Sequence, residues 1–161
     1  MPDDKTQREA LEQEARQKIS MARVRILTMA TKDISRAFFS GLVMKLEPKI
    51  EWRVPTAAVD GKRIYYNPKW VVSLTLMQLE GVLVHEVMHC KLKHMLRRSN
   101  RDRRLWNIAC DLAINSILQE AGFVLPDEGV FAGGRDYEDM PVSLAAEDYY
   151  RRLVVREQQQ Q

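Results

Sequence analysis

Residues 75–96 read TLMQLEGVLVHEVMHCKLKHML, and this stretch decides the fold that we expect for the chain. Thr75 and Gln78 have the spacing of a capping box, in which the two side chains satisfy free backbone amides at the start of a helix. The apolar residues that follow recur at helical spacing. Together these features predict a continuous helix from Thr75 to about Met95 or Leu96.

The middle of this helix carries a His-Glu-x-x-His motif at residues 85–89. His85 and His89 share one helix face because they lie four residues apart, so both imidazoles can reach one metal ion. Glu86 can then face a metal-bound water and act as its general base. Zinc suits this chemistry because it lowers the pKa of its bound water to about 7. We therefore predict one Zn²⁺ per chain, with Glu86 as the catalytic residue.

A catalytic zinc needs a third protein ligand, and Asp111 is our preferred candidate. It lies within a second expected helix, at residues 105–120, and is surrounded in sequence by apolar residues. A carboxylate buried there is unfavourable unless it meets a metal or a cation. Asn115 lies four residues further on the same face, where its amide can hold a ligand in place. The predicted metal ligands are therefore His85, His89 and Asp111.

His94 is the alternative third ligand. On a continuous helix it lies about 180° round the axis from His85 and points away from the metal. It would share the face of Val87 and Cys90, so we expect a packed histidine or one that supports a ligand. Cys90 points about 100° away from His89 and is not expected to bind metal.

The N-terminal part of the chain is helical in pattern from about Lys5 to Leu46. Thr31–Asp33 and Gly41 allow two helices in place of one. Apolar residues recur at spacings of three and four: Leu11, Ala15, Ile19, Ala22, Ile26 and Ala30. Glu47-Pro48 ends this segment, because the residue before a proline avoids helical angles.

The remaining elements are a hairpin, a loop and a last helix. Asp60-Gly61 lies between β-prone runs and predicts a hairpin in which both turn positions have positive φ. Residues 125–141 contain several Gly and Pro residues and predict a loop, and a last helix is expected from about Ser143 to Val155. The prediction is an α+β fold, mostly helical with a small β-hairpin or sheet. It forms a single domain over residues 1–156, followed by a frayed polar tail at 157–161.

The order of these residues resembles the gluzincins, which are thermolysin-like zinc peptidases. In that group an acidic ligand on the helix after the His-Glu-x-x-His motif completes the site, and a second acidic residue supports a histidine ligand. Asp111 and Asn115 occupy those two places, with Asp in place of Glu and Asn in place of Asp. The resemblance implies a zincin-like metallopeptidase core within the α+β fold. The shorter ligand implies that the two helices lie closer together.

A second resemblance covers most of the chain. It is similar to a bacterial family of metallopeptidase domains that often precede a von Willebrand A-like domain. The similar runs are Ile64–Pro68, Gly81–His89, Leu105–Asn115 and Ala145–Tyr150. This resemblance implies the fold and the metal site more than any substrate.

The composition indicates a folded protein, since the 161 residues are 45% hydrophobic and 29% charged. No apolar run reaches the length that a membrane span needs. The polar N-terminus does not resemble a signal peptide, and two cysteines are too few for a disulfide framework. We therefore expect a cytoplasmic protein without a membrane partner.

The function predicted from these features is zinc-dependent hydrolysis of peptide bonds in a peptide or protein substrate. Tyr137, Tyr149 and Tyr150 are candidates for the donor that stabilises the developing oxyanion. One alternative is a non-catalytic interaction module with a structural zinc site. Another is an anion- or nucleic-acid-associated protein that uses the basic cluster Lys91–Arg104. Nucleic acid is the less favoured partner, because the net charge is only +3 and no aromatic residues interleave with the cluster.

Overall fold

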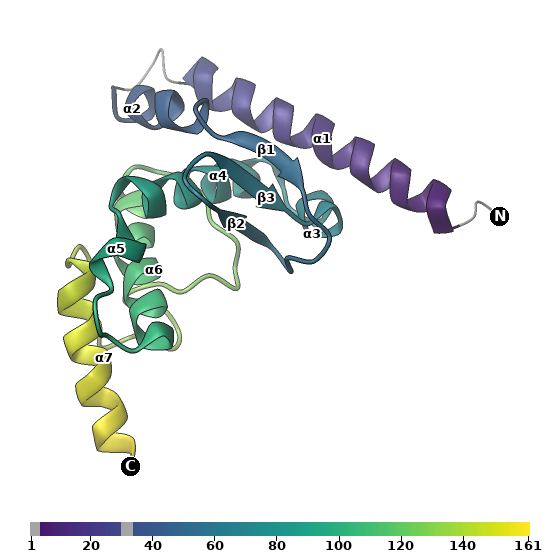
Figure 1. Cartoon of the computed structure of the whole chain (residues 1–161). Helices are drawn as coiled ribbons and strands as arrows, with labels where there is room; N and C mark the ends of the chain where they lie inside the picture. Colours follow the sequence, from purple (N-terminus) through teal and green to yellow (C-terminus); the bar gives the residue numbers. More distant parts are fainter. Residues whose placement is uncertain (1–3, 30–33) are drawn as a thin grey trace.

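The computed structural model describes residues 4–29 and 34–161, and it confirms the predicted α+β class (Figure 1). The helices are α1 (Asp4–Met29), α2 (Ile34–Val43), α3 (Pro68–Ser73), α4 (Leu76–Lys91), α5 (His94–Arg97), α6 (Arg103–Glu120) and α7 (Ala146–Gln160). The strands are β1 (Glu47–Ile50), β2 (Ala57–Val59) and β3 (Arg63–Tyr66). The break expected at Thr31–Asp33 lies outside the described residues.

The sheet has the order β1-β3-β2, with β2 antiparallel and β1 parallel to β3. The predicted hairpin is therefore present, but of its two turn residues only Gly61 has a positive φ, of 94°. The Asp60 carboxylate instead accepts hydrogen bonds from the backbone amides of Lys62 and Arg63, at 2.9 and 2.8 Å. The hairpin loop is thus longer than a two-residue turn.

Strand β1 was not predicted, because Glu47-Pro48 indicated only the end of a helix. An edge strand tolerates Pro48, since a residue that faces away from the neighbouring strand needs no N–H for the ladder. The backbone amides of Glu47 and Glu51 make the bonds to the β3 side, at 3.0 and 2.9 Å. The parallel pairing of β1 with β3 is a long-range contact, which local sequence does not reveal.

Two hydrophobic clusters meet at α6. The first joins α1, the sheet and α4, and the predicted stripe of α1 supplies Ala15, Ile19, Ala22 and Ile26 to it, all buried. The second joins α6 to α7 and the loop between them. Helix α6 contributes Ile114 and Leu118 to the first cluster and Leu105 and Trp106 to the second. The packing therefore fixes α6 against α4.

Helix α4 begins as predicted and ends earlier than predicted. The Thr75–Gln78 capping box is present, with hydrogen bonds of 3.0 and 3.1 Å. The prediction of a helix continuing to Met95 or Leu96 is wrong, because Lys93 adopts a left-handed conformation with φ 53°. The single-turn helix α5 follows and changes the direction of the chain.

Helices α6 and α7 are joined by residues 121–145, which contain no helix or strand, as predicted for 125–141. The Asp102 carboxylate caps α6 by accepting from the backbone amide of Leu105 at 2.9 Å. Helix α7 continues to Gln160, so residues 157–160 are helical where we expected a frayed tail. An ion pair between Arg104 and Glu157 ties this last turn to α6.

No helix within residues 4–29 and 34–161 combines the length and the apolar character that crossing a bilayer requires.

Gly81 allows α4 to approach the segment after α6, and replacing it should destabilise the fold. A Cβ atom at this position would lie 1.9 Å from the Val124 carbonyl oxygen, which is backbone and cannot turn aside. Alanine is otherwise the better helix former, but forcing extra atoms into a packed site typically costs about 1–3 kcal/mol. We expect Gly81→Ala to lower the free energy of unfolding by that amount in urea denaturation.

Gly41 provides the matched control, because it lies in α2 and a Cβ there meets nothing within 4 Å. Gly41→Ala should therefore leave the free energy of unfolding unchanged or raise it slightly. Equal stability of Gly81→Ala and the wild-type protein would contradict the close approach of α4 to Val124.

Candidate metal centre

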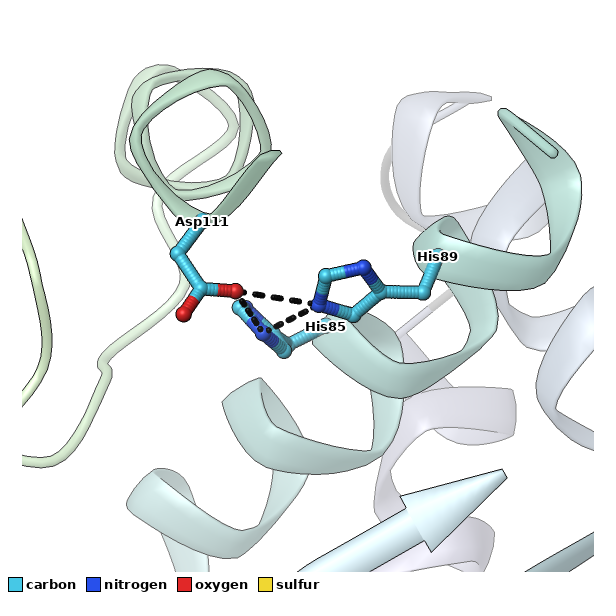
Figure 2. Close-up of side chains that lie close together, drawn as sticks. All are labelled: His85, His89 and Asp111. Carbon is cyan, nitrogen blue, oxygen red and sulfur yellow. Dashed lines mark hydrogen bonds and ion pairs between the residues drawn. The ribbon is translucent and has the colours of Figure 1, made fainter. Parts of the chain in front are cut away.

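Three side chains predicted as ligands converge between α4 and α6 (Figure 2). His85 and His89 project from one face of α4, and Asp111 reaches them from α6. The Nε2 atoms of the two histidines are 3.0 Å apart. The Oδ1 atom of Asp111 lies 3.0 Å from Nε2 of His89 and 3.2 Å from Nε2 of His85.

The triangle formed by Nε2 of His85, Nε2 of His89 and Oδ1 of Asp111 has the size that a tetrahedral zinc requires. With bonds of about 2.0–2.1 Å, ligand atoms around such an ion lie about 3.3 Å apart. The three side chains are 16%, 24% and 34% exposed for His85, His89 and Asp111, so the group is accessible from solvent. Two imidazole nitrogens and one carboxylate oxygen also suit zinc chemically, and they leave a fourth position open.

Asn115 orients His85, in the place where the sequence analysis expected it to support a ligand. Its Oδ1 lies 2.7 Å from Nδ1 of His85, so a proton on Nδ1 leaves the Nε2 lone pair facing the triangle. The Asn115 amide is itself fixed, because its Nδ2 donates to the Val130 carbonyl oxygen at 2.7 Å. A residue of α6 and the loop after it thus set the direction of a side chain on α4.

His94 lies against His89 and not at the triangle. Its Nδ1 is 3.3 Å from Nδ1 of His89, on the side of that ring opposite Nε2. The side chain is buried, as expected, but the position differs from the one predicted because α4 ends before it. Burial, together with the charges of His89 and Arg97, lowers the pKa of His94 to about 4, so its ring is neutral at pH 7.

His85 and Asp111 shift each other's pKa in opposite directions. Burial opposes protonation of His85, but contact with the Asp111 carboxylate outweighs it and raises the pKa of His85. Burial likewise opposes ionisation of Asp111, yet hydrogen bonds from His85 and His89 hold its pKa well below the usual range. Asp111 is therefore an anion that attracts a positive charge to this point, whether the charge is a proton or a metal ion.

Glu86 faces the same pocket as the triangle. Burial raises the pKa of its carboxyl, which moves a carboxylate towards the range in which it exchanges protons near neutral pH. The pocket has a volume of about 530 Å³. Besides the triangle and Glu86, its lining consists of Thr56, Ala57, Ala58, Trp70, Val82, Asn107, Asn115, Leu125, Pro126, Glu128, Gly129 and Val130.

Several of these residues were not predicted. Asn107 lies one helical turn before Asp111 on the same face of α6, and this spacing is the sequence signal that could have placed Asn107 at the pocket. Glu128 and its neighbours come from the loop after α6, which the sequence identified as a loop without indicating where it packs. These residues add a polar amide, a carboxylate and an apolar wall to the pocket.

The three tyrosines proposed for the oxyanion do not line this pocket. Tyr149 is fully buried and donates its hydroxyl proton to the Pro141 carbonyl oxygen at 2.6 Å. The Tyr150 hydroxyl accepts from the backbone amide of Asp102 at 2.9 Å, and the ring of Tyr137 packs against Arg156. Each of them therefore joins the loop or α6 to α7.

Several members of the basic cluster Lys91–Arg104 are engaged within the fold. Arg97 forms a bidentate ion pair with Glu147 of α7, with the shortest contact at 2.6 Å. The Arg101 guanidinium lies over the ring of Trp106 at 5.1 Å from its centroid. Trp106 is buried in the cluster between α6 and α7 and anchors α6. These contacts give the arginines a structural role in joining α5, α6 and α7.

Comparison with known proteins gives a family match over nearly the whole chain. The family described as "Putative metallopeptidase domain" matches residues 6–161. An uncharacterized protein of Thermotoga maritima is 38% identical over 66 residues, which are 39% of this chain and 17% of that relative. No solved structure matches the chain. On this match the chain belongs to that family, whose description implies a metal cofactor.

Proposed function

We propose that this protein is a zinc-dependent peptidase with a zincin-like core, in which His85, His89 and Asp111 hold the metal. One observation carries the proposal. The three ligand atoms converge within 4.8 Å of one another, on the wall of an open pocket that Glu86 also lines. A site built only to hold helices together would be closed by a fourth protein ligand. Among the residues that the structure describes, the group consists of these three.

The reaction that we propose is hydrolysis of a peptide bond by water. Zinc at such a site would lower the pKa of a bound water to about 7 and polarise the scissile carbonyl. Glu86 accepts a proton from the attacking water as the new C–O bond forms. It then delivers this proton to the amide nitrogen as the C–N bond breaks, so that an acid and an amine leave. Asn107 is a neutral polar side chain of α6 that lines this pocket, and it can donate to the developing oxyanion.

The outer edge of β2 offers a place for the substrate backbone. Strand β2 is an edge of the sheet, and its residues Ala57 and Ala58 line the pocket. The backbone N–H of Asn67 donates to the Thr56 carbonyl oxygen across the hairpin at 2.8 Å. Because the hydrogen-bonded residues alternate along an antiparallel strand, the backbone N–H and C=O groups of Ala57 and Val59 face outward. An extended peptide can pair with them as an added strand. This supports a peptide or an unfolded protein segment as substrate.

The free thiols of Cys90 and Cys110 fit a reducing compartment, so we propose that the peptidase acts in the cytoplasm.

Metal-reversible cleavage tests the proposal. We expect the purified protein to bind about one zinc per chain, to cleave members of a mixed peptide library, and to lose this activity after chelation. Zinc should restore the cleavage and magnesium should not, because magnesium prefers oxygen ligands in octahedral geometry. Metal content by atomic absorption and products by mass spectrometry provide the two measurements. A zinc-loaded protein that cleaves no peptide would favour a structural metal, and cleavage that survives chelation would contradict a metal mechanism.

A further inference from the structure

The end of α4 is shaped in a way that brings a third histidine to the metal centre without making it a ligand. Lys93 holds a left-handed conformation, which is unfavourable for a residue other than glycine. Residues of three helices, α5, α6 and α7, keep this turn in place. Arg97 donates to the Leu92 carbonyl oxygen at 3.0 Å, and Glu147 of α7 fixes Arg97. The indole N–H of Trp106 donates to the His94 carbonyl oxygen at 2.7 Å.

The result of this turn is a direct contact between two imidazoles. The Nδ1 atoms of His89 and His94 are 3.3 Å apart, and the rings meet edge to face with centroids 5.4 Å apart. The other nitrogen of His89, Nε2, faces His85 and Asp111. His89 can offer a lone pair at Nε2 only if its proton is on Nδ1. The Nδ1 atom of His94 is then the acceptor for that proton.

The second nitrogen of His94, Nε2, shows that this contact leaves a buried polar atom without a partner in the part of the chain that the structure describes. If Nδ1 accepts, the proton of the neutral ring is on Nε2. That atom is buried and has no hydrogen-bond partner among the described residues. An unpaired buried donor is unfavourable, so an apolar side chain of similar size would stabilise the fold more than this histidine does. The presence of a histidine at position 94 is therefore explained better by its contact with His89 than by its packing in the core.

We propose that His94 is a positioning residue for the metal ligand His89. It accepts the Nδ1–H of His89 and so keeps the Nε2 lone pair of His89 turned towards His85 and Asp111. Asn115 does the same for His85 with an amide oxygen at 2.7 Å. Both histidine ligands then have a partner on the nitrogen that does not face the metal. This inference rests on the proposed function for the identity of the ligands.

The test compares two variants with the wild-type protein and uses the metal alone as probe. His94→Leu keeps the bulk and removes the acceptor, whereas His94→Asn keeps an oxygen that can accept from His89. We expect His94→Leu to weaken zinc binding 10–100-fold in a competitive titration with a chelating dye. His94→Asn should stay within a few-fold of wild type. The visible absorption spectrum of the cobalt-loaded protein should change in His94→Leu and return towards wild type in His94→Asn.

Stability separates a positioning role from a packing role. The metal-free His94→Leu protein should unfold at a urea concentration no lower than wild type, because an unpaired buried donor has been removed. Tyr150→Phe is the control, since it removes a hydrogen bond to Asp102 in the same group of helices. It should lower the unfolding midpoint and leave zinc affinity unchanged.

Two results would overturn the inference, and they differ from failure of the proposed function. Unchanged zinc affinity in His94→Leu, together with lower stability, would make His94 a core residue only. Nitrogen-15 NMR of the wild-type imidazoles that places the proton of His94 on Nδ1 would remove the acceptor. A wild-type protein without affinity for zinc would instead defeat the metal centre itself.

Discussion

Replacing Glu86 with glutamine should leave a folded, metal-loaded protein that no longer cleaves peptides. The amide has the size of the carboxylate but cannot accept a proton from the attacking water, and general-base catalysis typically contributes 10²–10⁴-fold, or about 2.7–5.4 kcal/mol of barrier. Glu86 lines the pocket beside His85, His89 and Asp111, but it is not one of these three converging side chains. Zinc stoichiometry and the unfolding midpoint should therefore remain close to wild type. Initial rates of cleavage, measured at equal zinc loading, provide the test.

Glu120→Gln is the matched control for Glu86→Gln. Glu120 is an exposed carboxylate at the last residue of α6 and does not line the pocket. The control should cleave at the wild-type rate, which separates a change of total charge from the loss of one base. Wild-type cleavage by Glu86→Gln would show that another group takes the proton, and the proposed mechanism would then be wrong.

The convergence of His85, His89 and Asp111 could be predicted because the information for it is local. The spacing within residues 85–89 places two imidazoles on one helix face whatever the rest of the fold does. Asp111 could be chosen because a carboxylate among apolar neighbours needs a partner, and in the structure its partners are His85 and His89. The capping box at Thr75 and the helix that contains Trp106 could also be predicted from local sequence. Each required only the sequence of one turn or one helix.

The parts that could not be predicted depend on contacts between distant segments. Nothing in Lys91-Leu92-Lys93 indicates that the helix ends, because the turn is held by Trp106 and by the Arg97–Glu147 pair, which come from α5, α6 and α7. The wall of the pocket around Pro126 and the parallel strand β1 are further cases. The tyrosines near the C-terminus were associated with the site by residue type alone. The hydroxyls of Tyr149 and Tyr150 instead bind backbone groups, and the ring of Tyr137 packs against Arg156 of α7.

Zinc binding should weaken as pH falls, because protons compete for His85. Asp111 raises the pKa of His85 in the metal-free protein, so the proton contributes stability below the unfolded pKa of about 6.5. That contribution is lost as pH rises through the raised folded pKa, where the lone pair becomes available to a metal. Zinc affinity measured between about pH 5 and 8 should rise with pH in the wild-type protein. Affinity independent of pH in this window would contradict a histidine ligand.

Asp111→Ala should weaken zinc binding more than substitution of a residue that only contacts His85 or His89, such as Asn115 or His94. It removes one of three ligand atoms, so the loss should be at least the 10–100-fold, about 1.4–2.7 kcal/mol, that loss of a ligand's outer partner causes. Asn115→Ala, which frees the His85 ring without removing a ligand, should fall between Asp111→Ala and wild type. Asn107→Ala is the control for zinc affinity alone, which should stay at the wild-type value, since Asn107 lines the pocket one turn away on the same helix and is not one of the three converging side chains.

The same titration decides between the two residues that the sequence offered as third ligand. Asp111 has an oxygen 3.0 Å from Nε2 of His89, whereas His94 approaches the opposite nitrogen of that ring. Loss of zinc in Asp111→Ala, with weaker but measurable binding in His94→Leu, is therefore expected. Circular dichroism should show that both variants are folded. Tight zinc in Asp111→Ala together with complete loss in His94→Leu would reverse the assignment, because His94 would then have to turn past His89 to reach the metal.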